Sequence, residues 1–406
     1  MVVRRVFSFF SALRAVPGGI WAIGFITMMI NISTIIVFSL SPSYLTQVVG
    51  VSMRGIGQLE GVVEATSWLT RIFSGVMIDA FHKRRPVLMG AYALTAFARV
   101  MFVLAPNFGM IFAARFLDRM SNGIQATPRE AMVGDLAPKN LKGISFGLRQ
   151  SMTMMGSLIG ALIIQWGFKT WGMDYKTLFW IATIPPIAAV IVLPMLVKET
   201  AAPRLQKAPR LSLKQTLNLV TKLSSDFWRV SLVAFVYMLS NFSGAFLILH
   251  ATRHGLCDGA ESQAMIVQNL ATMVSALPVG WLADRFDRRY IIGFGFIIAM
   301  AANAFLALAE HSNHVLMGAG FWGLQVGIIQ SLLLTKVADT TTQEIRGTGF
   351  GVYYLLVGIA VFIANKITGH LFEESPTIAF TVSGCFAGLA ILGLPFIKAA
   401  GETKTS

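Results

Sequence analysis

Ionisable side chains recur at helical spacing inside an apolar stretch of this 406-residue sequence. Within it lie Glu60, Glu64, Ser67 and Arg71, at positions that share one face of a helix. A carboxylate in an apolar setting can bind and release a proton, and a nearby arginine can pair with it or hold an anion. These residues are therefore candidates for proton chemistry or for binding a charged solute.

A second polar stripe lies some fifty residues further on. It consists of Arg115, Arg119, Asn122, Gln125 and Arg129, again on one face of a helix. Glu64 and Arg119 fall near the middle of their stretches, so they would lie at similar depth. We expect them either to pair with each other or to bind a charged group between them.

The composition places both stretches in a membrane. Hydrophobic residues make up 55% of the chain and charged residues only 13%, whereas a soluble domain carries about 25% charged residues. A helix crosses a bilayer with about 20 residues. Twelve stretches of that kind are predicted, at 20–43, 52–78, 86–104, 108–133, 144–166, 177–197, 228–250, 261–283, 290–309, 313–336, 347–371 and 377–398. The predicted fold is an all-α integral membrane protein with twelve transmembrane helices.

The distribution of charge predicts the topology. The net charge is +14, but the Lys and Arg residues lie in alternate gaps between apolar stretches rather than on one solvated face, which argues against a nucleic-acid partner. Basic gaps face the cytoplasm. We therefore expect both termini to be cytoplasmic and the protein to be a multi-pass component of the inner (cytoplasmic) membrane.

The two sets of six stretches repeat each other. Gly75, Asp79, Lys83 and Arg84 recur 205 residues later as Gly280, Asp284, Arg288 and Arg289, and Gly123, Asp135 and Gly147 recur 204 residues later as Gly327, Asp339 and Gly351. This repeat predicts a six-helix half at 1–197, a cytoplasmic linker at 198–227 and a second six-helix half at 228–406. Repeated halves of this kind occur in secondary transporters, which bind substrate between them.

These motifs resemble those of the major facilitator superfamily. The segment from Gly75 to Arg84 is similar to the loop signature of that family between its second and third spans, although Ala80 and His82 depart from the pattern. The segment Arg119 to Gly123 resembles the fourth-span motif, with Asn122 in place of Gln. The resemblance implies a secondary transporter that exposes a midplane site alternately to each side of the membrane.

The loop motif has a physical interpretation as a gate. Asp79 would meet the positive end of a neighbouring helix and nearby arginines, while Lys83 to Arg85 would hold the loop at the anionic inner leaflet. Such contacts would latch the inner gate when the transporter faces outward. Alternatively, the basic residues serve only to set the topology.

Glu64, with Glu60, is the candidate for coupling transport to protons. An arginine beside a carboxylate favours its charged form and burial favours its neutral form, so pairing with Arg119 that depends on substrate would let Glu64 take up and release a proton. The alternative is a static salt bridge within the N-terminal half.

Polar residues in other stretches are candidates for lining a central cavity. The candidate substrate-binding residues are Asn31, Arg115, Asn122, Gln125, Asn241 and Gln325. Amides in a membrane equally hold helix to helix. Gly156 and Gly160 predict close helix packing in the fifth span.

The function that we predict is proton-coupled export of a small solute. The chain lacks a phosphate-binding Gly-x-x-x-x-Gly-Lys-Ser/Thr loop, so transport must be driven by a gradient. His250 and His254 have the spacing of metal ligands, with Cys257 and Asp258 just beyond, but interfacial histidines are common, and we predict no metal site. We expect no cofactor, no enzymatic activity and a monomer whose partners are the lipid bilayer, a small-molecule substrate and protons. The alternatives are import of a nutrient or metal chelate, or a receptor without transport on the same fold.

Overall fold

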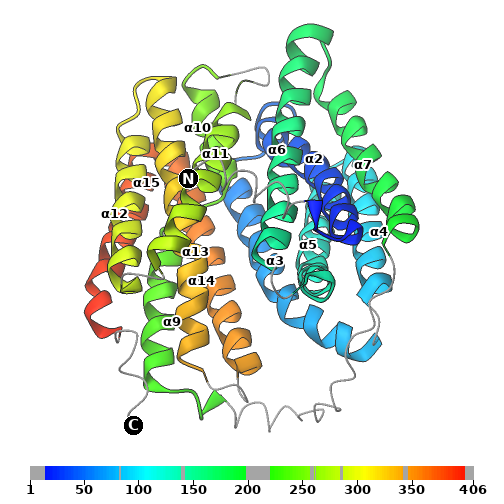
Figure 1. The fold of residues 1–406 in the computed structure, drawn as a ribbon. Helices are drawn as coiled ribbons and strands as arrows, with labels where there is room; N and C mark the ends of the chain where they lie inside the picture. The colour runs from blue at the N-terminus through cyan, green and yellow to red at the C-terminus, as the bar shows by residue number, and fades with distance from the viewer. Residues whose placement is uncertain are drawn as a thin grey trace, which may run out of the picture. The chain divides into compact units, whose positions relative to one another are not determined.

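The computed structural model describes residues 14–81, 84–138, 142–197, 220–256, 260, 262–283, 287–341 and 346–397. Every regular element among these residues is helical (Figure 1). The described residues form two compact units. Unit 1 comprises those of Met1–Phe38 and Thr70–Gln206, and unit 2 comprises those of Ser39–Leu69 and Lys207–Ser406.

Unit 1 takes helices from the first half of the chain. Its helices are α2 (Gly18–Gln47) as far as Phe38, α3 (Met53–Phe81) from Thr70 onward, α4 (Arg84–Val103), α5 (Phe108–Leu136), α6 (Lys142–Trp171) and α7 (Tyr175–Leu196). Its core packs apolar residues of α2 such as Ile20 and Ile23 against Leu88 of α4 and Leu193 of α7. Capping side chains start two of the helices, because Asn107 accepts a hydrogen bond from the Met110 N–H and Asp174 from the Thr177 N–H.

Unit 2 joins the second half of the chain to parts of the first two helices. Its helices are residues 39–47 of α2 and 53–69 of α3, followed by α9 (Ser225–Met238), α10 (Gly244–Arg253), α11 (Ser262–Ala283), α12 (Arg288–Ala307), α13 (Ser312–Asp339), α14 (Arg346–Glu374), α15 (Pro376–Leu392) and the short 3₁₀ helix η1 (Leu394–Phe396). Residues 39–69 therefore group with the second half by packing, whereas the halves predicted from the sequence follow its internal repeat.

A helix lies in each of the twelve predicted stretches, and seven of the described helices are long and apolar enough to span a membrane. Helices α3 and α5 are not among these seven, because they carry the two ionisable stripes. The predicted continuous span 228–250 is wrong in one respect. It is interrupted between Met238 and Gly244, where α9 ends and α10 begins (Figure 1).

Glycines bring several helices into close contact. A Cβ on Gly156 of α6 would lie 2.5 Å from the Met28 carbonyl oxygen, and one on Gly160 would lie 2.8 Å from that of Ile32. Both positions need glycine because α6 packs backbone to backbone against α2. The predicted close packing of the fifth span is confirmed.

Candidate functional site

The interruption between α9 and α10 is built from polar residues. The segment Ser240–Gly244 reads Ser-Asn-Phe-Ser-Gly, which contains residues that favour helix ends over helix interiors. Ser243 caps α10, and its Oγ accepts a hydrogen bond from the Ala245 N–H at 3.2 Å. A helix N-terminus inside the protein carries a partial positive charge, so this point is suited to an anion.

The carboxylate of Glu60 lies at this helix start. Glu60 is only 1% exposed, and its Oε2 accepts a hydrogen bond from the Ser243 hydroxyl at 2.7 Å. The Ser243 N–H donates to Oδ1 of Asn365, also at 2.7 Å. One residue of the break therefore links a predicted proton-coupling carboxylate on α3 to a buried amide on α14.

Glycines allow α3 and α14 to approach closely enough for these bonds. A Cβ on Gly57 would lie 2.6 Å from the carbonyl oxygen of Asn365 and 2.7 Å from the Cα of Gly369. One on Gly61 would lie 3.1 Å from the carbonyl oxygen of Phe362. The glycines thus set the distance between the helix that carries Glu60 and the helix that carries Asn365.

A cavity of about 210 Å³ opens beside this junction in unit 2. Its lining includes the second predicted carboxylate, Glu64, and residues of the helix break, among them Asn241 and Ser243. Indole rings from α3 and α13, Trp68 and Trp322, form much of its apolar wall. The cavity combines a carboxylate, amides and aromatic faces, which is the mixture typical of small-molecule sites.

The two predicted cavity residues of the second half have different positions. Asn241 lines the cavity and donates from Nδ2 to the Tyr237 carbonyl oxygen at 3.3 Å. Gln325 is 2% exposed, and its Oε1 accepts a hydrogen bond from the Tyr237 hydroxyl. Gln325 therefore supports a cavity wall from behind, through Tyr237, which itself lines the cavity.

Two of the three arginines of the second stripe, Arg115 and Arg119, are buried in unit 1, and Arg129 is half-buried. Arg115 is 1% exposed and Arg119 8% exposed, and their guanidinium carbons lie 5.9 Å and 5.2 Å from the centre of the Phe38 ring. These distances fit cation–π contacts. Glu64 belongs to unit 2, so its pairing with Arg119 stays a prediction.

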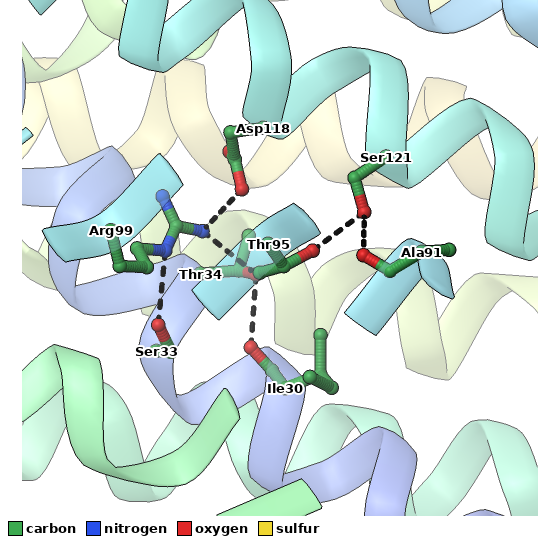
Figure 2. A network of polar contacts seen from close by, with 8 residues as sticks. All are labelled: Ile30, Ser33, Thr34, Ala91, Thr95, Arg99, Asp118 and Ser121. Atoms are coloured by element: carbon green, nitrogen blue, oxygen red, sulfur yellow. Dashed lines mark hydrogen bonds and ion pairs between the residues drawn. The ribbon is translucent and has the colours of Figure 1, made fainter. Parts of the chain in front are cut away.

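The same unit contains a buried ion pair that the sequence analysis missed. Nη2 of Arg99 lies 3.1 Å from Oδ1 of Asp118, and Nε of Arg99 donates to the Ser33 hydroxyl at 3.0 Å. Nη2 also donates to Thr34 Oγ1 at 3.3 Å. Figure 2 shows the guanidinium of α4 pointing toward Asp118 of α5 and toward both hydroxyls of α2.

A hydroxyl pair extends this polar cluster between α4 and α5. The hydroxyl oxygens of Thr95 and Ser121 lie 2.7 Å apart, and Ser121 donates to the Ala91 carbonyl oxygen at 2.5 Å (Figure 2). Arg99 interrupts an apolar stretch, and this signal was present in the sequence because a charge in a membrane helix is costly and needs a partner.

The remaining predicted cavity residues of the first half are amides. Asn31 donates from Nδ2 to the Thr153 carbonyl oxygen at 2.7 Å and to the Ser157 hydroxyl at 2.5 Å. These bonds hold α2 to α6, as the alternative interpretation expects. On α5, Gln125 is buried and Asn122 is half-buried, and their role at a cavity stays a prediction.

The structure describes only part of the two motifs that are predicted to form a gate. Gly75 and Asp79 lie on α3 and Gly280 on α11, while Lys83 and Asp284 lie outside the described residues. Arg84 forms an ion pair with Asp135, and Arg288 forms one with Asp339 at 2.7 Å. Both pairs join the start of one helix to the end of the next.

The second arginine of each motif also makes an equivalent contact. Nη2 of Arg85 donates to the Pro194 carbonyl oxygen at 2.6 Å, and Nη1 of Arg289 donates to the Ile397 carbonyl oxygen at 3.1 Å. By these contacts Arg84 is the equivalent of Arg288 in the repeat, and Arg85 is the equivalent of Arg289. Both equivalent positions are separated by 204 residues. The repeat predicted from the sequence matches Arg84 with Arg289, and the structure corrects this alignment by one residue.

The ring nitrogens of the two histidines at the end of α10 contact backbone carbonyl oxygens. Nε2 of His250 lies 2.9 Å from the Leu306 carbonyl oxygen, and the two ring nitrogens of His254 lie 2.9 Å from the carbonyl oxygens of His250 and Ala309. Among the residues that the structure describes, His, Cys, Asp and Glu form no group suited to a metal ion. Cys257 and Asp258 lie outside those residues.

Comparison with known proteins identifies the family. The profile of the Major Facilitator Superfamily matches residues 20–260 and 258–405. An uncharacterized MFS-type transporter of Methanocaldococcus jannaschii is 24% identical over 395 residues, covering 95% of this chain and 96% of that protein. The 3-(3-hydroxy-phenyl)propionate transporter of Escherichia coli is 21% identical over 331 residues, covering 80% and 79%.

The fold agrees with this assignment. A crystal structure of a mutant of the nucleoside transporter NupG superposes with a TM-score of 0.80 at 9% identity, covering 93% of this chain and 99% of that one. The protein is a multi-pass integral membrane protein of the secondary-transporter class, with a small molecule as its substrate. It belongs to the Major Facilitator Superfamily.

Proposed function

We propose that this protein exports a small organic solute in exchange for protons, by alternating access across the cytoplasmic membrane. The observation that carries the proposal is the position of Glu60. Its carboxylate is almost fully buried on α3, bonded to the residue that starts α10, and one helical turn from Glu64 in the cavity wall. An ionisable group in that position is costly and is therefore expected to be functional.

The contacts of Glu60 suggest how a proton would act. A charged carboxylate accepts the Ser243 hydroxyl and is stabilised by the positive end of α10. Protonation removes the charge and weakens both interactions. Proton uptake would thus loosen α3 from the break between α9 and α10, which borders the cavity. Glu64, and Arg119 with it, would make this change depend on the solute.

The arginine–aspartate pairs support a role for the loop motifs in gating. Arg84 with Asp135 and Arg288 with Asp339 hold the motif of each repeat at the ends of neighbouring helices. We propose that these motifs, with Asp79, latch the inner gate. Asp135→Asn and Asp339→Asn are expected to slow substrate-driven flux while leaving substrate affinity unchanged.

The test of the proposed function is substrate-triggered proton movement in inside-out vesicles. Vesicles with an acidified lumen are challenged with organic cations, organic anions, amino acids and metal chelates, and the lumenal pH is followed. An exporter of this kind releases protons from the lumen when one class of compound is added, and Glu60→Gln and Glu64→Gln abolish the release. Glu373→Gln is the matched control, because Glu373 is an exposed carboxylate paired with Arg54. Proton release that survives both cavity-side substitutions would refute the assignment.

A second candidate is uptake of an acidic nutrient. The relative from Escherichia coli is named for 3-(3-hydroxy-phenyl)propionate, a carboxylate, and unit 1 buries Arg115 and Arg119. Uptake with protons would make the medium around right-side-out vesicles alkaline when such an acid is added. A solute/proton antiporter given the same external acid would exchange it for protons from the vesicle lumen and would acidify the medium.

A further inference from the structure

The described lining of the cavity in unit 2 offers no unpaired charge to a ligand. It contains no Lys, Arg or His, so an anion would find no cationic partner among these residues. The one carboxylate among them, that of Glu64, already interacts with another group of the protein. Because an ion that leaves water without a partner is costly to bury, this wall favours an uncharged ligand.

The hydroxyl groups of the wall are also committed to the protein. Ser243 donates its hydroxyl hydrogen to Glu60, and Tyr237 donates its own to Gln325. Asn365 is fully buried and uses both ends of its side-chain amide within the protein, since Oδ1 accepts one hydrogen bond and Nδ2 donates another. The polar groups that remain for a ligand are two other amides of the lining.

Gln268 on α11 presents a hydrogen-bond donor to the cavity. Its Oε1 is buried away from the cavity, although the side chain lines it. The end of the amide that is directed at the cavity is therefore Nε2. No acceptor for the Nε2 hydrogens is found among the residues that the structure describes.

Asn241, in the break between α9 and α10, presents an acceptor to the same cavity. Its Nδ2 donates to the Tyr237 carbonyl oxygen at 3.3 Å, and the half-buried side chain lines the cavity. The Tyr237 hydroxyl also lies near this amide, but it gives its hydrogen to Gln325 and is no donor for Oδ1 of Asn241. Within the described part of the chain, Oδ1 thus accepts no hydrogen bond.

Aromatic faces complete the wall. The ring centres of Phe242 and Trp322 lie 4.1 Å apart, and both residues line the cavity together with Trp68. Aromatic rings pair favourably with other rings in offset-stacked or edge-to-face arrangements. The cavity has about 210 Å³, whereas sites for drug-sized ligands have about 300–1,000 Å³. The ligand is therefore small, and the wall suits a ligand that contains a ring.

We propose that this cavity binds a small uncharged aromatic amide, or a heterocycle with the same hydrogen-bonding groups. Its carbonyl oxygen accepts a hydrogen bond from Nε2 of Gln268, its N–H donates to Oδ1 of Asn241, and its ring lies against the indoles of Trp68 and Trp322. The proposal rests on the proposed transport function and names the substrate class of that same site. A ligand with one donor, one acceptor and no charge matches the groups that this wall leaves available.

The test measures equilibrium binding to the full-length protein in detergent by titration calorimetry. The probes are benzamide, benzamidinium and benzoate, which share one shape. Benzamide has a donor and an acceptor, whereas benzamidinium has donors only and benzoate acceptors only. We expect benzamide to bind at least about tenfold more tightly than either ion, which corresponds to about 1.4 kcal/mol. Binding of either ion as tightly as benzamide would overturn the proposal.

Three variants locate the site. Asn241→Leu and Gln268→Met each remove one of the two amides and should weaken benzamide binding by about fivefold or more. Gln268→Glu replaces the donor with an acceptor, so it should reduce the preference for benzamide over benzamidinium. Undiminished benzamide binding by a folded Asn241→Leu protein would contradict the proposal. If that protein does not fold, undiminished binding by Gln268→Met, or an unchanged preference in Gln268→Glu, would do the same.

The matched control is Glu373→Gln. The carboxylate of Glu373 pairs with Arg54 and is not part of the cavity lining, so its loss should leave benzamide binding unchanged. A loss of binding in this control as large as that in Asn241→Leu would show that the effect is not local to the cavity and would overturn the assignment.

The outcome separates this inference from the transport proposal. Benzamide binding, with no proton flux in vesicles for any compound tested, would leave the site assigned and refute proton-coupled export. Proton flux driven by a charged compound, without benzamide binding, would refute the site and leave export standing.

Discussion

The ion pair of Arg99 and Asp118 allows a quantitative test of how charge is held inside unit 1. The two side chains are 2% and 7% exposed, and their charged atoms lie 3.1 Å apart. Asp118→Asn keeps the shape and an acceptor oxygen but removes the negative charge. Breaking a buried pair by removing one partner costs about 3–5 kcal/mol, because the other charge stays buried. Arg115 and Arg119 are buried in the same unit, so the loss leaves three arginines without this carboxylate.

The chain supplies its own control for this substitution. Arg54 and Glu373 also lie 3.1 Å apart, but their side chains are 53% and 38% exposed. Exposed pairs contribute about 0–1 kcal/mol, so Glu373→Gln should change stability little. Because the two ion pairs have the same distance between their charged atoms but differ in burial, the difference between the two losses of stability measures the effect of desolvation.

The assay is reversible unfolding in mixed micelles, with the free energy of unfolding measured for wild type, Asp118→Asn, Asp118→Leu, Arg99→Met and the double variant Arg99→Met/Asp118→Leu. The single variants should lose several kcal/mol, and the double variant should recover most of that loss, since apolar residues can replace a buried pair at little cost. The coupling energy follows from the double-mutant cycle. If Asp118→Asn were as stable as Glu373→Gln, or the double variant no better than the single ones, the reasoning from burial would be wrong.

Three further predictions follow from other contacts. Ser243→Ala removes the hydroxyl that bonds buried Glu60 and caps α10, so we expect a loss of about 1–3 kcal/mol in stability and weaker proton coupling in vesicles, both rescued by Ser243→Thr. Gly57→Ala would place a Cβ 2.6 Å from a backbone oxygen of α14, so stability should fall by about 1–3 kcal/mol, whereas alanine at the exposed Gly90 should be harmless. At the start of α12, burial raises the pKa of Asp287, but the hydrogen bonds from Arg289 and the charge of Arg289 lower this pKa by more. The lowered pKa stabilises the folded protein above the unfolded pKa of about 3.9, and this stabilisation should be lost as the pH falls below that value. An Asp287→Asn protein should lack this decline in thermal stability.

Helix positions were predictable because each one needs a long apolar stretch, and the twelve predicted stretches all contain helices. The break between α9 and α10 was missed, although its residues were visible. Ser240 and Ser243 lie between apolar segments on both sides, and the average hydropathy of the whole stretch concealed them. A helix-capping pattern inside a predicted span is the signal that would have revealed the break.

The charged stripes were predictable as sets, but the partners of their members were not. Helical spacing shows which side chains share a face, whereas the rotation and depth of neighbouring helices decide what that face meets. Asn31 illustrates the difference, because its amide was a candidate for a cavity and instead bonds α6. Arg99 was overlooked because it forms no stripe of its own on α4, and its partners come from α2 and α5.

The internal repeat separates the contacts of the shared fold from those of one half. At an offset of 204 residues, Arg84 and Asp135 correspond to Arg288 and Asp339, and both copies form the ion pair. A contact that both copies of the repeat make belongs to the shared fold of the two halves, so we assign it to the helix framework.

The buried charges behave differently. At the same offset Arg99, Asp118 and Arg119 correspond to Asn303, Trp322 and Gly323, all of them uncharged. Since both halves fold without sharing these charges, the fold does not require them, and Trp322 instead lines the cavity of unit 2. At these three interior positions the two halves therefore differ in charge, and this difference is a reason to seek proton and solute specificity there rather than in the duplicated loops.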